Sequence, residues 1–137
     1  MRKKIRKYWN SYYKNYKPNN EPSNFSKFIY KKFLKKNNVL LDIGTGDGRD
    51  AFFFRKKIKF VYGIDLSNIA IVKNNKKISK LNFKNINFKN ISIISLKSLK
   101  NKKINFIYGR FFIHAIDSAK ENIFLNNIAK YFKNKTL

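Results

Sequence analysis

The apolar positions of this chain follow two spacings. Continuous apolar runs, which are typical of buried strands, cover residues 39–43 and 60–64, and two runs with looser bounds cover 86–94 and 104–116. Between them, apolar residues recur every three or four positions, which predicts helices over about 49–57, 67–79 and 118–133. The pattern therefore predicts strands that alternate with helices along most of the chain.

Ahead of the first strand, residues 1–38 have the pattern of two helices. Apolar and aromatic residues recur at helical spacing over residues 1–17 and again over about 23–37, and the segment 18–22 begins and ends with proline, which marks a loop. The first helix carries an aromatic row made of Trp9, Tyr12, Tyr13 and Tyr16. For this row, packing against the domain is favoured over a lid for a ligand.

Alternating strands and helices imply a parallel sheet with right-handed crossovers. The expected fold class is α/β, a Rossmann-like three-layer sandwich with about four strands in a mostly parallel sheet. We expect one domain over residues 1–137, with a helical segment at 1–38 and the Rossmann-like core at 39–137, incomplete at its C-terminal side. Residues suited to cap the helices are Ser23 or Asn24, Ser67, and Ser118 with Glu121 as a capping box.

Glycines at alternate positions follow the first strand. Gly44, Gly46 and Gly48 remove side chains where the backbone turns and approaches a ligand closely. In a parallel sheet this loop lies beyond the carboxyl ends of the strands, where ligands bind. A dinucleotide fingerprint is not met because the glycine spacing differs, and a Walker loop is excluded because no Gly-Lys-Ser/Thr follows.

Two carboxylates flank this loop. Asp42 precedes the first glycine by two residues; it would repel a pyrophosphate but suits an ammonium or a sulfonium group. Asp65 ends the second strand at about twenty residues from the loop, the spacing expected of an acid that accepts from ribose hydroxyls. Together these residues predict S-adenosylmethionine as the cofactor.

Residues 39–65 resemble motifs I and II of class I S-adenosylmethionine-dependent methyltransferases. The segment 41–48 matches the family's Asp/Glu-x-Gly-x-Gly-x-Gly, and 62–67 matches the second-strand motif with its ribose acid. The resemblance implies that Asp42 faces the methionine amino group and that Asp65 holds the ribose. The other residues of the predicted cofactor site are Gly44, Thr45, Gly46, Gly48, Leu66 and Ser92.

A narrower resemblance, to small-molecule methyltransferases that often accompany surface-glycan synthesis, covers most of the chain. It rests on Trp9 with Tyr12 and Tyr13, and on segments 21–25, 48–54 and 110–116. It implies a small-molecule acceptor, with a sugar or glycan precursor as a lead. His114, the only histidine, follows the fourth strand and is the candidate catalytic base, with a packed or capping histidine as the alternative. Arg110 either holds an anionic acceptor or pairs with a carboxylate.

The chain departs from the family at three points. The acid that commonly accepts from the adenine amino group is replaced by Ser92 or Asn90, either of which still accepts a hydrogen bond. The acid common at the start of the fourth strand is Asn105. Family members usually continue through a fifth strand and an antiparallel pair, so we expect a truncated chain. The outer edge of the fourth strand would then be open to a homodimer partner or a complementing chain.

The charge leaves alternative functions open. Lys and Arg number 32 against 7 acids, and the formal net charge of +25 favours an RNA methyltransferase or RNA-binding protein. The cations are spread along the chain together with much Asn, Ile, Phe and Tyr, as drift toward A- and T-rich codons would produce, so nucleic acid is not the favoured partner. A third alternative is a non-catalytic cofactor-binding remnant or half of a split enzyme.

Composition also bears on metals and location. One histidine, no cysteine and scattered carboxylates give no ligand spacing for a metal. The basic start is not followed by an apolar stretch suited to a signal peptide or a membrane span. A cytoplasmic protein with no metal and no membrane partner is therefore expected.

Overall fold

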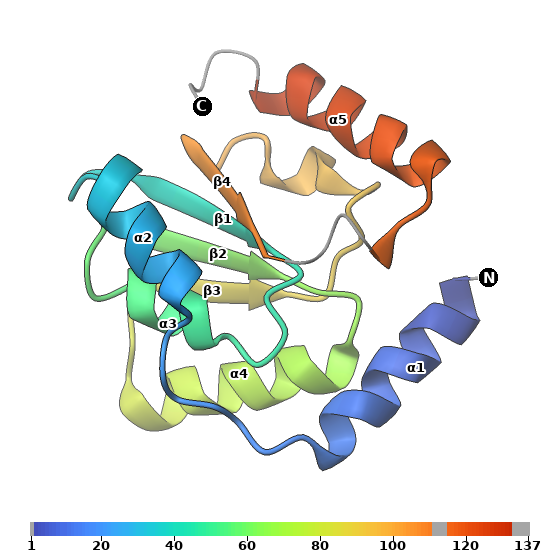
Figure 1. The fold of residues 1–137 in the computed structure, drawn as a ribbon, viewed down its shortest axis with the longest axis horizontal. Helices are drawn as coiled ribbons and strands as arrows, with labels where there is room; N and C mark the ends of the chain where they lie inside the picture. The colour runs from blue at the N-terminus through green and yellow to red at the C-terminus, as the bar shows by residue number, and fades with distance from the viewer. Residues whose placement is uncertain (1, 111–114, 133–137) are drawn as a thin grey trace.

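Four parallel strands form the sheet of the computed structural model, which describes residues 2–110 and 115–132 (Figure 1). Across the sheet the order is β3 (Ile86–Lys89), β2 (Phe60–Ile64), β1 (Val39–Ile43) and β4 (Phe106–Gly109). Every pairing in it is parallel, with Val39 opposite Phe60 and Leu40 opposite Phe106. The prediction of an α/β fold with a parallel sheet is confirmed.

Helices cover both faces of the sheet (Figure 1). One face packs against α2 (Asn24–Phe33), α3 (Arg49–Phe54) and α4 (Asn68–Leu81). The other packs against the 3-10 helix η1 (Leu96–Leu99) and α5 (Ser118–Phe132). The remaining helix, α1 (Arg2–Asn15), lies beside α4 near the carboxyl ends of the strands.

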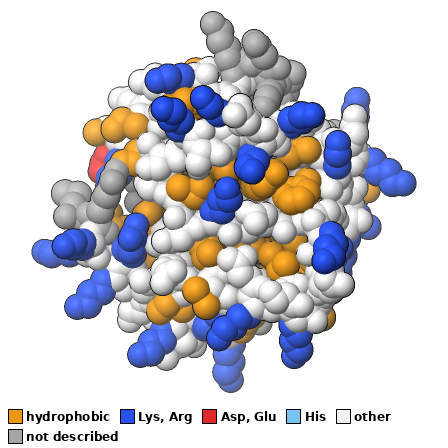
Figure 2. Space-filling model, turned by 180° about the vertical axis from the view of Figure 1, so that it is seen from behind, with side chains coloured by type: hydrophobic (Ala, Val, Ile, Leu, Met, Phe, Trp, Pro, Cys, Tyr) orange, Lys and Arg blue, Asp and Glu red, His pale blue; other side chains and the backbone are white. Residues whose placement is uncertain are grey.

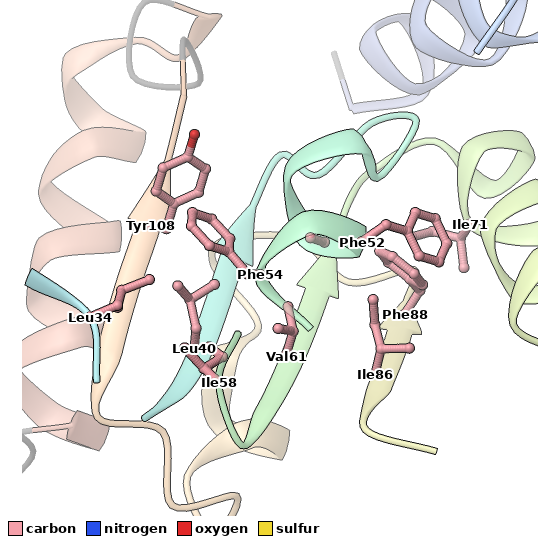
Figure 3. Packing of buried hydrophobic residues seen from close by; sticks show 11 residues of the cluster. Leu34, Leu40, Phe52, Phe54, Ile58, Val61, Ile71, Ile86, Phe88 and Tyr108 are labelled. Carbon is pink, nitrogen blue, oxygen red and sulfur yellow. The ribbon is translucent and has the colours of Figure 1, made fainter. Parts of the chain in front are cut away.

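Alternation along β1 divides its side chains between two cores. Leu40 belongs to the core beneath α2, α3 and α4, together with Phe54 and Val61 (Figure 3). Leu41 and its neighbours on the same side belong to the core beneath η1 and α5. All five residues of β1 are buried, which is why the strand reads as an unbroken apolar run apart from Asp42.

Phe88 of β3 connects this first core to the glycine loop. Its ring packs on Phe52 at a centroid distance of 5.3 Å (Figure 3). A Cβ at Gly63 would collide with the same ring, and one at Gly48 would lie 3.1 Å from it. The backbone of β2 and the end of the glycine loop thus approach one aromatic side chain closely, and Gly63 leaves the space that it needs.

Two predictions about the ends of elements were wrong, namely the last residue of the third strand and the residue that caps the last helix. The third strand ends at Lys89 instead of near residue 94, because the Asn90 amide turns the chain by donating to the carbonyls of Asp65 and Leu66, both at 2.9 Å. Helix α5 is capped by Asp117, whose carboxylate accepts from the Lys120 amide at 2.9 Å, and not by the predicted Ser118 capping box. The caps at Ser23 and Ser67 are confirmed.

The sheet has an open edge in the part of the chain that the structure describes, where β4 pairs with β1 alone. Lys and Arg side chains are spread over the face opposite to that of Figure 1 and do not gather in one patch there (Figure 2). Among residues 2–110 and 115–132, no helix has the length and apolarity needed to cross a membrane.

Candidate active site

The glycine loop leaves β1 at Ile43 and is closed by backbone hydrogen bonds. The amide of Thr45 donates to the Ile64 carbonyl at 3.0 Å, and the amide of Gly48 donates to the Thr45 carbonyl at 2.9 Å. Gly44, Gly46 and Gly48 all have positive φ angles, between 54° and 75°. The loop therefore has the left-handed turns that alternate glycines permit, and it passes the end of β2.

Asp42 is buried at the end of β1, at 3% exposure. Its Oδ2 accepts a hydrogen bond from the Thr45 hydroxyl at 2.7 Å. Burial raises the pKa of Asp42 to about 8, although the bond from Thr45 opposes the shift. At neutral pH this carboxyl group is therefore largely protonated. A cation bound beside it would favour its ionisation, and the attraction between the two charges would be strong because the site is buried.

Asp65 joins the glycine loop to the start of α4. Its Oδ2 accepts from the Gly46 amide at 2.9 Å and its Oδ1 accepts from the Ser67 amide at 2.8 Å. Burial raises the pKa of Asp65, against these backbone bonds. Each oxygen keeps a lone pair for a further donor, so the side chain can accept from two adjacent hydroxyls.

A cavity of about 290 Å³ lies above these groups. Most of the predicted site residues line it, namely Asp42, Gly44, Thr45, Gly46, Asp65, Leu66, Ser92 and Arg110. Gly48 is not in the wall; it forms the N-cap of α3 and lies against Phe52 and Phe88. His114, the candidate base, lies outside the described residues.

The structure distinguishes the two replacements considered for the adenine-binding acid. Ser92 lines the cavity, whereas the Asn90 amide is bonded to the Asp65 and Leu66 carbonyls. Asn105 lies at the opposite end of the sheet, where its Oδ1 accepts from the Val39 amide at 2.9 Å. Of Ser92, Asn90 and Asn105, only Ser92 is therefore placed to contact a ligand in the cavity.

Asp50 is the centre of a buried polar network that sequence reasoning missed. It accepts from the amide and the hydroxyl of Ser23, both at 2.8 Å, and from the Tyr108 hydroxyl at 2.7 Å. The Arg110 guanidinium pairs with it at 3.2 Å. Burial opposes ionisation, but the bonds from Tyr108 and Ser23 outweigh it and lower the pKa of Asp50. Of the two roles considered for Arg110, the described contact is the pairing with a carboxylate.

The aromatic row of α1 lines the cavity, contrary to the favoured prediction of a packing stripe. Asn10 fixes the helix, since its Oδ1 accepts from the Ser67 hydroxyl at 2.9 Å and from the Ile69 amide at 3.3 Å. The Lys73 ammonium also donates to the Tyr13 carbonyl. The hydroxyl of Tyr13 consequently lies against the Gly46 backbone, where a Cβ would stand.

We expect Gly46→Ala to destabilise the protein and to distort the loop. The new Cβ would collide with the Tyr13 hydroxyl, and alanine at a φ of 54° costs about 1 kcal/mol or more. Urea denaturation should show that the free energy of unfolding falls by about 2 kcal/mol. In a Tyr13→Ala background the collision is absent, so the loss should be smaller and should reflect only the strained φ angle. An unchanged denaturation midpoint would contradict the close approach of α1 to the loop.

Comparison with known proteins identifies the family. Residues 34–136 match the family model described as a methyltransferase domain, and the chain belongs to that family. The prediction of a class I S-adenosylmethionine-dependent methyltransferase is confirmed at this level. Among the described residues, no group of three or more acidic or histidine side chains is arranged to hold a metal.

Three relatives illustrate the match. A cobalt-precorrin-6B C(15)-methyltransferase (decarboxylating) assigned in Methanocaldococcus jannaschii is 39% identical over 57 residues, which are 42% of this chain and 31% of that protein. An Aquifex aeolicus S-adenosylmethionine-dependent methyltransferase superposes with a TM-score of 0.64 at 25% identity, over 75% of this chain and 57% of that one.

A Haemonchus contortus phosphoethanolamine N-methyltransferase 1, solved with phosphoethanolamine and S-adenosylhomocysteine, superposes with a TM-score of 0.76 at 16% identity. The alignment covers 95% of this chain and 29% of that one, and at this identity it shows the fold alone. The chain thus spans about a third of the curated relative and less than two thirds of these structures.

Proposed function

We propose that the chain binds S-adenosylmethionine in the cavity and acts as a methyltransferase on a small-molecule acceptor. The observation that carries the proposal is the placement of Asp42 and Asp65 on either side of the glycine loop, both in the cavity wall. The buried Asp42 carboxyl suits the ammonium group of the cofactor, and Asp65 retains acceptor capacity for both ribose hydroxyls. The residues present therefore fit this cofactor.

When bound, the cofactor supplies an electrophilic methyl group, and the protein's task is mainly to orient two reactants. Gly44, Thr45, Gly46 and Leu66 would border the cofactor, and the Ser92 hydroxyl would accept from its adenine amino group. Arg110, also in the wall, would attract an anionic group of the acceptor while it stays paired with Asp50. Proton removal by His114 stays a prediction.

A small acceptor is supported by α1, whose aromatic side chains form one wall of the cavity. The curated relative, named for a reaction on cobalt-precorrin-6B, gives weak support of the same kind. The sugar or glycan precursor, the cytoplasmic location, and a homodimer or complementing chain at the open edge of β4 stay predictions.

Calorimetry with S-adenosylhomocysteine tests the cofactor assignment. We expect Asp65→Ala to weaken binding at least tenfold, because two ribose hydroxyls lose a charged acceptor and each such bond contributes about 1.5–3 kcal/mol. Glu21→Gln is the matched control, since that acidic side chain is exposed and outside the cavity wall. Failure of the folded wild-type chain to bind the ligand would overturn the proposal.

RNA is the alternative acceptor because of the net charge of +25. It requires RNA binding without cofactor that weakens steeply with salt. A remnant without activity would bind S-adenosylhomocysteine and transfer no methyl group to any acceptor.

A further inference from the structure

The wall that α1 contributes to the cavity is made of aromatic rings. Tyr12 and Tyr16 are stacked with centroids 5.3 Å apart, Tyr13 meets Tyr16 edge to face at 5.7 Å, and Trp9 stacks on Tyr13 at 6.2 Å. All four rings line the cavity. Aromatic faces carry partial negative charge, so a group of rings around a cavity attracts cations.

Asp47 and Asp65 add to this field, whereas Asp42 is largely protonated at neutral pH and Asp50 is paired with Arg110. Four of the seven acidic residues of the chain line the cavity, although the protein as a whole is strongly basic. Asp47 and Asp65 lie nearest to the aromatic wall: burial and these two charges raise the pKa of Tyr13, and burial and the Asp47 charge raise that of Tyr16. The two phenols stay neutral next to fixed negative charge.

Each cation of the cavity wall has a partner other than Asp47, although the charge of Arg49 still acts on Tyr16 and partly offsets the effect of Asp47 there. Arg110 pairs with Asp50, Lys120 pairs with Asp117 at 3.4 Å, and the Arg49 Nε donates to the Glu21 carbonyl at 2.7 Å. Asp47 accepts from backbone amides, of Arg49 at 3.2 Å and of Asn19 at 3.4 Å, and its side-chain hydrogen bond with Tyr16 helps to raise the pKa of that phenol. In the described residues no lysine or arginine forms an ion pair with Asp47.

We propose that the aromatic wall of α1 and Asp47 bind an ammonium group of the methyl acceptor, which makes the substrate an aliphatic amine. This inference rests on the proposed function and adds the substrate class to it. The cofactor's own ammonium group is matched by Asp42, which lies at the end of β1 beneath the loop, so the acceptor's group takes the wall on the α1 side. Trp9, Tyr13 and Tyr16 offer ring faces and Asp47 offers the counter-charge.

Trp9 is the only tryptophan and lies in this wall, so its fluorescence reports occupancy directly. The probes are choline and 3,3-dimethylbutanol, which have the same shape but differ in charge. With S-adenosylhomocysteine at saturation, we expect choline to bind about tenfold more tightly than the alcohol, as desolvated cation–π contacts imply. Asp47→Asn and Tyr16→Leu should each remove most of that preference.

Tyr8→Leu is the matched control. Tyr8 is on the same helix and touches Trp9, but it is 62% exposed and outside the cavity wall, so the preference for choline should be kept. Equal affinity for the two probes, or a preference that survives both wall substitutions, would overturn the inference. Binding of S-adenosylhomocysteine is measured separately by calorimetry. Failure of that binding alone counts against the cofactor assignment, and loss of the charge preference alone counts against the amine.

Discussion

Replacing Asp42 with asparagine is expected to weaken S-adenosylhomocysteine binding about a hundredfold while the fold is kept. The amide can still accept the hydrogen bond from the Thr45 hydroxyl, but it offers no negative charge to the ligand's ammonium group. Removal of one partner from a buried charge pair costs about 2–5 kcal/mol. Calorimetry measures the loss, and Asp117→Asn, a change at an exposed carboxylate outside the cavity, is the matched control.

The Asp42→Asn substitution should also change how the free energy of unfolding depends on pH. Asp42 has a pKa of about 8 in the folded protein and near 3.8 when unfolded, so between these values the folded state holds a proton that the unfolded state has lost. The free energy of unfolding therefore falls as pH rises from about 4 to 8, and Asp42→Asn removes that fall.

Ligand binding at pH 7 should release close to one proton and should strengthen up to pH 8. Calorimetry in buffers of different ionisation enthalpy measures the release. A pH-independent affinity in the wild type would contradict a neutral Asp42.

Asp50→Ala is expected to be the most destabilising single change in the site, by about 3–5 kcal/mol. It removes the acceptor of four interactions and leaves the Tyr108 hydroxyl and the Ser23 amide buried without it. Urea denaturation measures the loss, with Glu121→Ala as an acidic control outside the network. Because folding lowers the pKa of Asp50, its contribution is complete above about pH 4 and is lost as pH falls through the lower folded-state value.

A double-mutant cycle separates the network from simple loss of a side chain. The second change is Tyr108→Phe, which removes the same 2.7 Å hydrogen bond as Asp50→Ala. We therefore expect the double variant to lose clearly less free energy of unfolding than the sum of the losses in the two single variants. Additive losses, or an Asp50→Ala loss below about 1 kcal/mol, would contradict the role given to Asp50.

Local signals explain what could be predicted from the sequence. The buried run of β1, the alternate glycines and Asp65 at the end of β2 are each specified within a few residues, and the family match supports the fold that they predicted. Ser67 is another example, because a helix cap is decided by the hydrogen bond to the amide three residues on, at 3.1 Å.

Contacts between distant segments explain what was missed. Asp50 meets Ser23 across 27 positions and Tyr108 across 58, and no spacing rule connects them. The third strand was predicted too long because residues 91–94 are as apolar as a strand, yet Ile91, Ile93 and Ile94 line the cavity instead. The aromatic row of α1 had the right helical spacing, but its direction depends on Asn10 and Ser67, 57 residues apart.

The packing of Phe88 against Gly63 and Gly48 makes the two sequence motifs mechanically dependent on each other. A larger residue at position 63 would disturb the glycine loop in two ways: its Cβ would lie 3.0 Å from the Thr45 hydroxyl, and it would displace the Phe88 ring that lies against Gly48. A variant that carries alanine at position 63 should therefore need a smaller side chain at position 88 and a small shift of Thr45. The end of β2 around position 63 and the glycine loop after β1 would then tolerate substitutions only in combination. A library that randomises one of these segments should yield folded variants only when position 88 is allowed to vary with it.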